Sequence, residues 1–545
     1  MRFGRAVIVG VFITALLISA GCGQVSEKQE PKKSEIQLGG TLVYGSLQEP
    51  NTLNPFLSEF IATAEVANLI FSGLVSMNDK GEWIADLAQE VPTLQNGGIS
   101  ADGLTVIYRL RPGVTWHDGT PFTSGDVKFT WEFVMNRQVN VVSREGYDKI
   151  AAVDTPDAQT VIIRFRQQYA PVLNLFSKVL PKHILGQSED MNKASFNRSP
   201  VGTGPFKFKE WRIAEAIVLE ANGAYFRGKP KLSGIIYKIM PEINILLTQL
   251  KAGEIDIVGN IGLAHYEQVK ALSTVKTVVT PNLIWEHFDF NLDNPLFQDM
   301  RVRQAVALAI DRQAILNTAL KNVASPASGD QSPISWAYNP SVKPAVRDVN
   351  AARELLAQAG WKQGPDGVFA KDGRRLSFSL ATTAGNKVRE TTAQMIVQQL
   401  KEAGIETEVR LIEPPAFFAD ILKNRRFETA MYAWVGGSDP DNLSLWNSKR
   451  IPAAGNGFEG LNYPGWRNPE IDMLTEQAAR IIDLDQRRQR YFRIQEILVQ
   501  EYPVIPLYFR ANIDAVKAVV VNYRPNPTPA GNLWNAWEWA LTVKK

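Results

Sequence analysis

The fold class is decided by the stretch LSFSLATTAGNKVRETTAQMIVQQLKEAGIETEVRLI, residues 376–412. Its first part, residues 376–381, is typical of a strand that leads into a helix. Apolar residues then recur every three or four positions over residues 388–402, which predicts the helix, and Gly404 ends it. The next residues, 404–412, again have the pattern of a strand. Strand, helix and strand in this order predict a βαβ unit, in which the two strands are parallel.

The same alternation continues on both sides of this stretch. We expect a short helix near residues 416–422 and a further strand over residues 427–435. Before the stretch, the dipeptide Asp372-Gly373 separates two strand-like runs and predicts a hairpin. The second half of the chain is therefore predicted to be an α/β unit with a largely parallel sheet.

The first half has a different pattern, and we expect the boundary near residues 280–291. Thr123 followed by Asp126 forms a capping box, which predicts that a helix begins there. The expected elements of this half are strands over residues 41–45, 106–110 and 160–166 and helices over residues 62–74 and 127–135.

Cys22, the only cysteine, follows a stretch with the pattern of an export signal: a charged start, an apolar run and small residues. The apolar run, residues 6–20, is shorter than the roughly 20 residues that span a bilayer. Ser19, Ala20 and Gly21 precede Cys22, an arrangement that resembles a bacterial lipobox, although Ser19 stands where Leu is usual. We therefore predict lipidation of Cys22; the alternative is an ordinary signal peptide with an incidental cysteine.

Composition restricts the function of the remaining chain. The net charge is +3 without a dense Lys/Arg run, which argues against nucleic-acid binding. The four histidines are not at metal-ligand spacing, so no metal site is predicted. We find no G-x-S-x-G, H-E-x-x-H or Walker-type loop. These absences, together with the predicted lipid anchor, favour a binding protein without a cofactor over an enzyme.

Six segments resemble the signature segments of the family 5 extracytoplasmic solute-binding proteins, the dipeptide-, oligopeptide- and nickel-binding components of ABC importers. These segments are VTWHDGTPFTSGDVKFTWE, GTGPFKFKEW, NGAYFRGKPKL, LTQLKAGEIDI, DMRVRQAVALAIDR and EYPVIPLY. The resemblance runs in order from about Gly39 to Trp539. It implies an α/β, two-lobed, periplasmic-binding-protein type II-like fold, with an inserted subdomain in the first lobe and a hinge of two crossing strands.

The resemblance also implies a division of the chain. We expect a lipoprotein signal peptide at 1–21, the lipidated cysteine and a flexible tether at 22–38, lobe I at 39–282 with its inserted subdomain at about 75–200, lobe II at 283–509, and a C-terminal return to lobe I at 510–545. The polar composition of the tether fits a flexible spacer. The segment at residues 502–509 is expected to be the returning crossing strand.

The predicted ligand site begins where the strand over residues 427–435 ends. In open α/β sheets ligands bind beyond the carboxyl ends of strands, and an extended peptide can pair with backbone there. The resemblance implies that this loop contacts peptide backbone and that an Asp in it receives the peptide ammonium. Peptide binders of the family typically read W-x-x-D, whereas this chain has Gly437 at the Asp position, after Trp434. Either Asp439 has taken over the ammonium, or no carboxylate does so.

Other candidate residues follow from the same resemblance. It implies that residues 59–61 pair with peptide backbone and that Arg389 lies near the position at which some dipeptide binders hold the ligand carboxylate. The alternatives are a core Trp at a strand end for Trp434, a turn with a solvated carboxylate for Asp439, and a solvated cation for Arg389. The complete set of predicted ligand-binding residues is Glu59, Phe60, Ile61, Arg389, Trp434, Val435, Gly436, Gly437, Ser438 and Asp439.

The expected function is therefore that of a monomeric, extracytoplasmic lipoprotein of an ABC importer. It would bind short peptides between its lobes and deliver them to the permease, which works with ATPase subunits. Gly437 motivates an alternative in which the same fold binds a non-peptide solute, such as a sugar, a metal chelate or an opine-like compound. An alternative of another class is a secreted hydrolase with unrecognised paired carboxylates.

Overall fold

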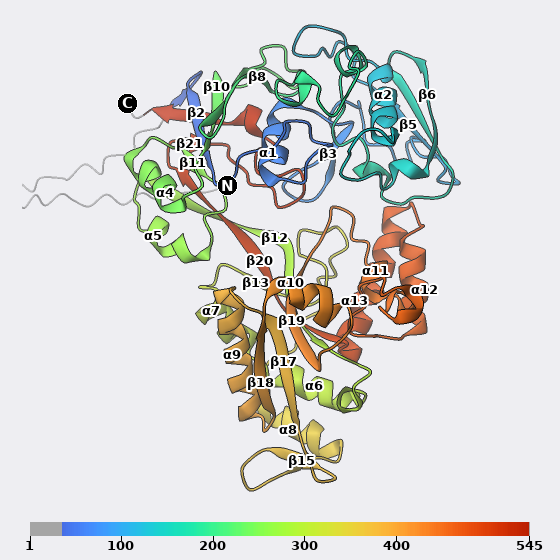
Figure 1. Cartoon of the computed structure of the whole chain (residues 1–545), viewed down its shortest axis with the longest axis vertical. Helices are drawn as coiled ribbons and strands as arrows, with labels where there is room; N and C mark the ends of the chain where they lie inside the picture. The colour runs from blue at the N-terminus through green and yellow to red at the C-terminus, as the bar shows by residue number, and fades with distance from the viewer. Residues whose placement is uncertain (1–34, 544–545) are drawn as a thin grey trace, which may run out of the picture.

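The computed structural model describes residues 35–543, which form two lobes joined by two long crossing strands (Figure 1). These strands, β12 (Val275–Phe290) and β20 (Val504–Lys517), pair antiparallel along most of their length. In Figure 1 they descend from the lobe that contains α1 and β2 to the lobe that contains α9 and β17. The hinge of two crossing strands that the resemblance implied is confirmed. Cys22 lies outside the described residues.

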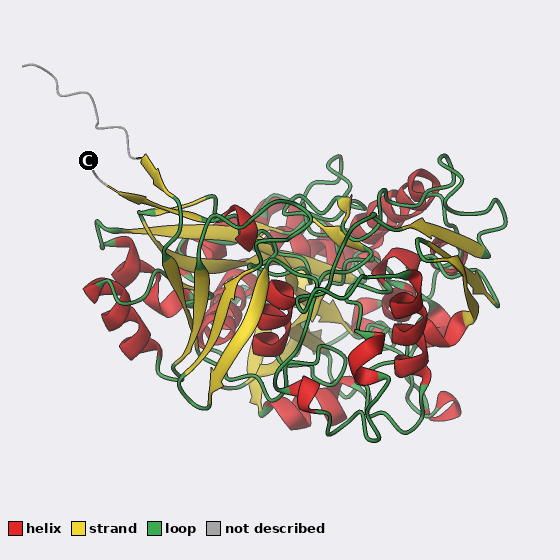
Figure 2. Ribbon diagram, turned by 90° about the horizontal axis from the view of Figure 1, so that it is seen from above, coloured by secondary structure: helices red, strands yellow, loops and turns green. Residues whose placement is uncertain are grey.

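One sheet of eleven strands passes through both lobes, and its twist is visible from above in Figure 2. Its strand order is β18-β17-β19-β12-β20-β11-β2-β10-β9-β8, and β13 (Ser325–Pro326) pairs with β20. The first lobe contributes β2 (Thr41–Ser46), β8 (Phe206–Arg212), β9 (Ala216–Ala221), β10 (Gly234–Ile239) and β11 (Ile257–Val258). The second lobe contributes β17 (Ser377–Thr383), β18 (Glu406–Ile412) and β19 (Thr429–Val435).

The predicted βαβ unit is confirmed in the second lobe. Strand β17 pairs parallel with both β18 and β19, and α9 (Lys387–Glu402) connects β17 to β18. The helix begins at Asn386, whose side chain accepts a hydrogen bond from the backbone N–H of Arg389 at 3.1 Å. Its face with Ala393, Ile396 and Leu400 is buried in the core of this lobe.

The predicted hairpin at Asp372-Gly373 is also present. It joins β15 (Phe369–Lys371) to β16 (Arg374–Arg375), and β14 (Lys362–Gln363) pairs with β15. Asp372 and Gly373 have φ values of 50° and 76°, as a type I′ turn requires. The remaining helices of the lobe are α6 (Met300–Ala309), α7 (Arg312–Thr318), α8 (Val349–Gln358), α10 (Pro414–Ala416), α11 (Leu443–Trp446), α12 (Pro469–Ala478) and α13 (Leu484–Glu501), and a π-helical turn over Phe417–Leu422 follows α10.

The first lobe carries a smaller unit beside its part of the large sheet (Figure 1). Helix α2 (Ser124–Met135) packs there on a separate sheet of β5 (Thr105–Arg109), β7 (Thr160–Phe165) and β6 (Ile150–Asp157). The predicted capping box is present, because the Thr123 N–H donates to Asp126 Oδ2 at 2.9 Å. The other elements of this lobe are β3 (Val75–Met77), β4 (Trp83–Ala85), α1 (Ile61–Ile70), α3 (Lys182–Leu185), α4 (Ile243–Ala252) and α5 (Tyr266–Lys270).

The helix predicted over residues 62–74 ends earlier than expected, because α1 stops at Ile70. The following residues run instead beside the segment around Phe176, where the Leu74 N–H donates to the Phe176 carbonyl at 3.0 Å. A Cβ on Gly73 would lie 2.3 Å from the Ser177 carbonyl oxygen, so this close approach requires glycine. The apolar residues of the segment are buried without being helical.

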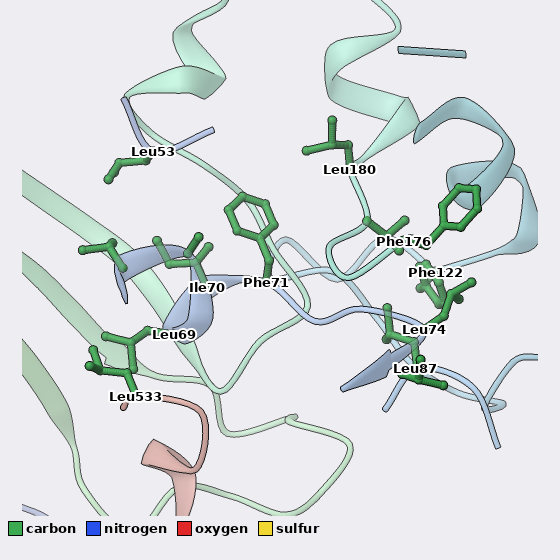
Figure 3. Packing of buried hydrophobic residues seen from close by; sticks show 14 of the residues in the cluster. Leu53, Leu69, Ile70, Phe71, Leu74, Leu87, Phe122, Phe176, Leu180 and Leu533 are labelled. Carbon is green, nitrogen blue, oxygen red and sulfur yellow. The ribbon is translucent and has the colours of Figure 1, made fainter. Parts of the chain in front are cut away.

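The core of the first lobe includes residues from distant parts of the chain (Figure 3). Leu69, Ile70 and Phe71 pack there with Phe176 and with Leu533 from the C-terminal segment. At the end of that segment, β22 (Ala540–Val543) pairs with β1 (Glu35–Gln37) and with β21 (Val520–Val521). Within residues 35–543, no helix is long and apolar enough to cross a membrane. The individual domain boundaries stay predictions.

Candidate ligand-binding cleft

Four hollows lie between the described residues of the two lobes. One, of about 250 Å³, lies at the hinge and is lined by residues such as Asn260, Glu286 and Asn386. We call the other three together the interlobe cleft. The first, of about 370 Å³, is lined by Asn68, Val75, Ser76, Met77, Trp83, Asn174, Ser177, Lys178, Gly437, Ser438, Pro529 and Ala530; we call it the Gly437 cavity. The second, of about 500 Å³, is lined by residues such as Trp83 of the first lobe and Arg488 of the second. The third, of about 510 Å³, is lined by residues such as Tyr169 of the first lobe and Arg487 of the second. Among the described residues, no hydrogen bond or ion pair joins residues 39–274 to residues 290–502.

The loop after β19 reaches this cleft, as its place at the carboxyl end of a strand predicts. Val435 is 73% exposed, and the Gly436 N–H donates to the Leu283 carbonyl at 2.9 Å. Gly437 and Ser438 line the Gly437 cavity. A Cβ on Gly437 would meet no atom closer than 3.5 Å, so packing does not demand glycine at the position where the family's peptide binders have Asp. The roles of these residues in binding stay predictions.

Asp439 is held by an arginine from α13. Its two carboxylate oxygens each accept a hydrogen bond from Arg487 at 2.8 Å. Arg487 is buried, and it also donates to the Ala478 carbonyl at 2.7 Å and to the Tyr491 hydroxyl at 3.1 Å. Burial disfavours the charged form of Arg487, but Asp439 outweighs this effect and raises the arginine pKa. The alternative of a solvated carboxylate at Asp439 is therefore wrong.

Trp434 contributes to an aromatic cluster beside the cleft. Its ring stacks on the ring of Tyr463, with 5.8 Å between the ring centroids, and lies edge-on to the ring of Tyr432, with 5.6 Å between the centroids. Across the ladder it lies directly opposite Trp285 of β12. Its side chain is partly buried and packs against two hydrophobic clusters of the second lobe. The residues that line the three hollows do not include Trp434, so its contact with a ligand stays a prediction.

Arg389 belongs to a buried ion-pair network at the hinge. Its Nη2 and Nε donate to the two oxygens of Glu286 at 2.9 and 3.2 Å, and Nη1 donates to Thr383. Arg510 of β20 donates to the same carboxylate. Burial opposes ionisation of Glu286, but the two guanidinium groups outweigh it and lower the pKa of Glu286. The alternative of a solvated cation is wrong for Arg389, and its contact with a ligand carboxylate stays a prediction.

Glu59, Phe60 and Ile61 precede or begin α1 on the surface. Phe60 is 42% exposed and Ile61 is 71% exposed, and Glu59 is exposed as well. The Phe60 N–H donates to Ser58 Oγ at 3.1 Å. These residues do not line the three hollows, so their pairing with peptide backbone stays a prediction.

Lys178, which the sequence analysis did not single out, lines the Gly437 cavity from the first lobe. Its side chain is partly buried and has no hydrogen-bond or ion-pair partner within residues 35–543. Burial lowers the pKa of Lys178 to about 8, although the nearby Asp86 opposes this shift. The one feature of the sequence that could have indicated this residue is the position of a single Lys inside the apolar run LFSKVL, residues 175–180.

Metal binding finds no support in the described residues. They contain no group of three or more His, Cys, Asp or Glu side chains that could hold an ion. The buried His287 has Nδ1 at 2.6 Å from Asp289 Oδ1, and burial lowers the pKa of His117 to about 4. Neither histidine lines the interlobe cleft.

The fold and the cleft define a two-lobed binding protein, and the comparisons identify its family. Residues 82–453 match the model for the bacterial extracellular solute-binding proteins, family 5 Middle. The oligopeptide-binding protein AppA of Bacillus subtilis is 32% identical over 543 residues, 97% of each chain. The chain therefore belongs to the family 5 extracellular solute-binding proteins.

Solved structures agree with this assignment. The complex of Bacillus subtilis AppA with a nonapeptide has a TM-score of 0.66 at 31% identity, and the match covers 93% of this chain and 100% of that chain. NikZ of Campylobacter jejuni, in complex with Ni(L-His), has a TM-score of 0.68 at 28% identity, over 92% and 99% of the chains. The open form of the murein tripeptide-binding protein MppA has a TM-score of 0.81 at 21% identity, over 94% and 99%, which supports the fold.

Membership of this family confirms the predicted fold class. It also confirms the prediction of a binding protein over an enzyme, because the family consists of extracellular solute-binding proteins. The alternative of a secreted hydrolase is not supported.

Proposed function

We propose that this protein captures short peptides in its interlobe cleft and delivers them to the permease of an ABC importer. The observation that supports this most strongly is the 32% identity to an oligopeptide-binding protein over 97% of both chains. A chain related over its whole length is expected to keep both the cleft and the surfaces that dock on a permease. ATPase subunits of the importer would drive the transport.

The edge of β19 offers a place for peptide backbone. Strand β12 covers one edge over residues 429–435, whereas β17 pairs with the other edge over residues 429–431 alone. Within the described part of the chain, no strand covers the second edge at residues 432–435. An extended peptide can add to such an edge through main-chain hydrogen bonds, which favours loose sequence preference.

The hinge supports capture by closure of the lobes. The pairing of β12 with β20 shifts register between Pro281 and Trp285 and again between Glu286 and His287. Such irregularities interrupt the ladder where the strands pass from one lobe to the other. No hydrogen bond joins residues 39–274 to residues 290–502 within the described chain, so rotation about this hinge would break apolar contacts, such as that of Ile482 with the core of the first lobe, but no hydrogen bond across the cleft.

Attachment to the outer face of the membrane through lipidated Cys22 completes the proposal, and the protein would act as a monomer. Substitution of Cys22 by Ala is expected to move the protein from the membrane fraction to the medium or periplasm. Metabolic labelling with palmitate, followed by fractionation, tests this. A variant that stays labelled and membrane-bound would contradict the anchor.

The binding experiment is thermal unfolding of the full-length protein in detergent, after bound ligand has been removed by unfolding and refolding. Peptides of two to six residues, each in free and in N-acetylated form, are compared with an equimolar mixture of their free amino acids as the control. A ligand at about 100 times its Kd adds roughly 2.7 kcal/mol to the free energy of unfolding. If no peptide stabilises the protein beyond the control, the proposed function is wrong and the non-peptide alternative gains support.

A further inference from the structure

The two walls of the Gly437 cavity differ in charge. Lys178 is the one charged residue among the described residues that line the cavity, and no acidic residue lines it. The wall from the second lobe consists of Gly437 and Ser438, which carry no charge. The cavity is therefore positively charged when Lys178 is protonated.

The position of Lys178 is fixed by its backbone. The neighbouring Val179 N–H donates to the Ser72 carbonyl at 3.1 Å, and the Leu74 N–H donates to the Phe176 carbonyl at 3.0 Å. Phe176 and Leu180 on either side are buried in the core of the first lobe (Figure 3). Lys178 thus belongs to a rigid part of the cavity wall, and its partial burial is a property of the fold.

The nearby acid, Asp86, favours the charged form of Lys178 but is shared with an arginine. Asp86 lies in an adjoining small pocket that Lys178 also lines. Asp86 is engaged there by Arg227, whose Nε lies 3.5 Å from Oδ1, and by the Gly73 N–H, which donates to Oδ2 at 3.1 Å. The charges of Asp86 and Arg227 offset one another, so one positive charge remains at Lys178.

The second lobe supplies no free carboxylate to balance this charge. The family's Asp position is Gly437, and Asp439 is neutralised by Arg487. A peptide ammonium in the Gly437 cavity would face Lys178 without an acidic partner, and a partly buried like-charge pair is unfavourable. A carboxylate in the same place would gain a charge-assisted hydrogen bond from an ammonium that otherwise has no partner.

We propose that the ligand of this protein presents a carboxylate, and not a free ammonium, to Lys178 at the Gly437 end of the cleft. This inference rests on the proposed function and specifies its substrate class. The ligands are peptide-like compounds whose amino-terminal end reaches this cavity and carries a carboxylate in place of the free ammonium. Lys178 is the residue that determines this preference.

The experiment is isothermal titration of the full-length protein in detergent with three probes of one backbone: trialanine, N-acetyl-trialanine and N-succinyl-trialanine. Acetylation removes the ammonium, and succinylation also adds a carboxylate. We expect the succinyl probe to bind about tenfold more tightly than the acetyl probe, the size of one hydrogen bond to a charged group. In Lys178→Met the succinyl and acetyl probes should bind with about equal affinity, whereas Lys178→Arg should keep the tenfold difference.

The outcomes separate this inference from the proposed function. If trialanine binds as tightly as the succinyl probe, or if Lys178→Met leaves the ratio unchanged, the inference is wrong while peptide binding stands. If none of the three probes binds and no other peptide stabilises the protein, the proposed function fails, and the inference fails with it. Lys178→Met removes a charge without a partner, so this variant is expected to fold.

Discussion

Two cations, Arg487 and Lys178, reach the interlobe cleft from opposite lobes, and they differ in whether the protein neutralises them. Arg487 has a bidentate carboxylate partner in Asp439 and two further acceptors. Lys178 has no partner in the described residues. The comparison teaches that proximity to the cleft alone does not mark a ligand-binding charge. A charge that is already paired maintains the fold, and an unpaired one is available to a ligand.

The largest effect is expected for Asp439→Asn. This change leaves the buried Arg487 without its ion-pair partner, which costs about 3–5 kcal/mol of the free energy of unfolding. Urea unfolding of the unliganded protein measures it. Asp441→Asn is the matched control, because the exposed Asp441 makes only local hydrogen bonds and has no ion pair. If Asp439→Asn is fully stable and loses affinity for peptides with a free ammonium, Asp439 is a ligand residue after all.

Arg389→Met tests whether a buried ion pair at the hinge also maintains the fold. We expect a loss of about 3 kcal/mol, the low end for a broken buried pair, because Arg510 still contacts Glu286. The lowered pKa of Glu286 adds a pH signature. The ionised Glu286 stabilises the folded protein at pH values above its unfolded pKa, near 4.5. This stabilisation is lost as the pH falls through the lower pKa that Glu286 has in the folded protein.

The free energy of unfolding should therefore fall less between pH 7 and pH 3 in the Arg389→Met variant than in the unchanged protein. The exposed ion pair of Arg301 provides a control, since Arg301→Met is expected to change stability very little. A variant of Arg389 with unchanged stability and weakened binding of ligand carboxylates would assign Arg389 to the ligand site.

Lys178→Met is expected to stabilise the unliganded protein, in contrast to the two changes above. A pKa lowered from 10.5 to about 8 means that the folded state disfavours the charged lysine, by roughly 1–3 kcal/mol after allowance for solvent. The gain in the free energy of unfolding should be full below pH 8 and should disappear as the pH rises through 10.5, because the lysine is neutral in both states only above that pH. The neighbouring charged and titratable groups are Asp86, Arg227 and Tyr225.

Chemical unfolding of Lys178→Met and of the unchanged protein, at pH 7 and at pH 9.5, measures how the gain in the free energy of unfolding depends on pH. A destabilised Lys178→Met variant at pH 7 would show that the ammonium has a favourable role in the unliganded fold, and the contrast with Arg487 would then be lost.

The smallest effect is expected for Gly437→Asp, which restores the carboxylate typical of the family's peptide binders. Space is available, because a Cβ at this position meets no atom closer than 3.5 Å. The new carboxylate should partly neutralise Lys178 and shift the ratio of affinities for free and N-acetylated peptides about tenfold toward the free form, or about 1.4 kcal/mol. Gly437→Asn is the neutral control in the same titration. Equal ratios for the two variants would contradict the expected charge effect.

The sequence predicted the fold well because its signals are local or periodic. The turn at Asp372-Gly373, the capping box at Thr123 and the βαβ pattern each depend on residues close together in the chain. Helix α1 was predicted too long, since the path after Ile70 depends on contacts with residues more than 100 positions later.

The electrostatic state of the candidate site could not be predicted in the same way. Asp439 and Arg389 were identified as charged residues, but their partners Arg487 and Glu286 lie 48 and 103 positions away. Lys178 was missed because its burial results from the pairing of two separate loops. Whether a charge is paired is a property of the tertiary structure, whereas its presence is a property of the sequence.

The most direct measurement identifies which ligands the protein selects from a mixture. The protein, stripped of ligand, is incubated with an equimolar library of tripeptides in free, N-acetylated and N-succinylated form, re-isolated, and its bound ligands are identified by mass spectrometry. We predict that bound peptides are enriched in forms with a carboxylate at the amino-terminal end, and that Lys178→Met loses this enrichment. A bound set dominated by peptides with a free ammonium and a neutral first residue, unchanged in Lys178→Met, would contradict it.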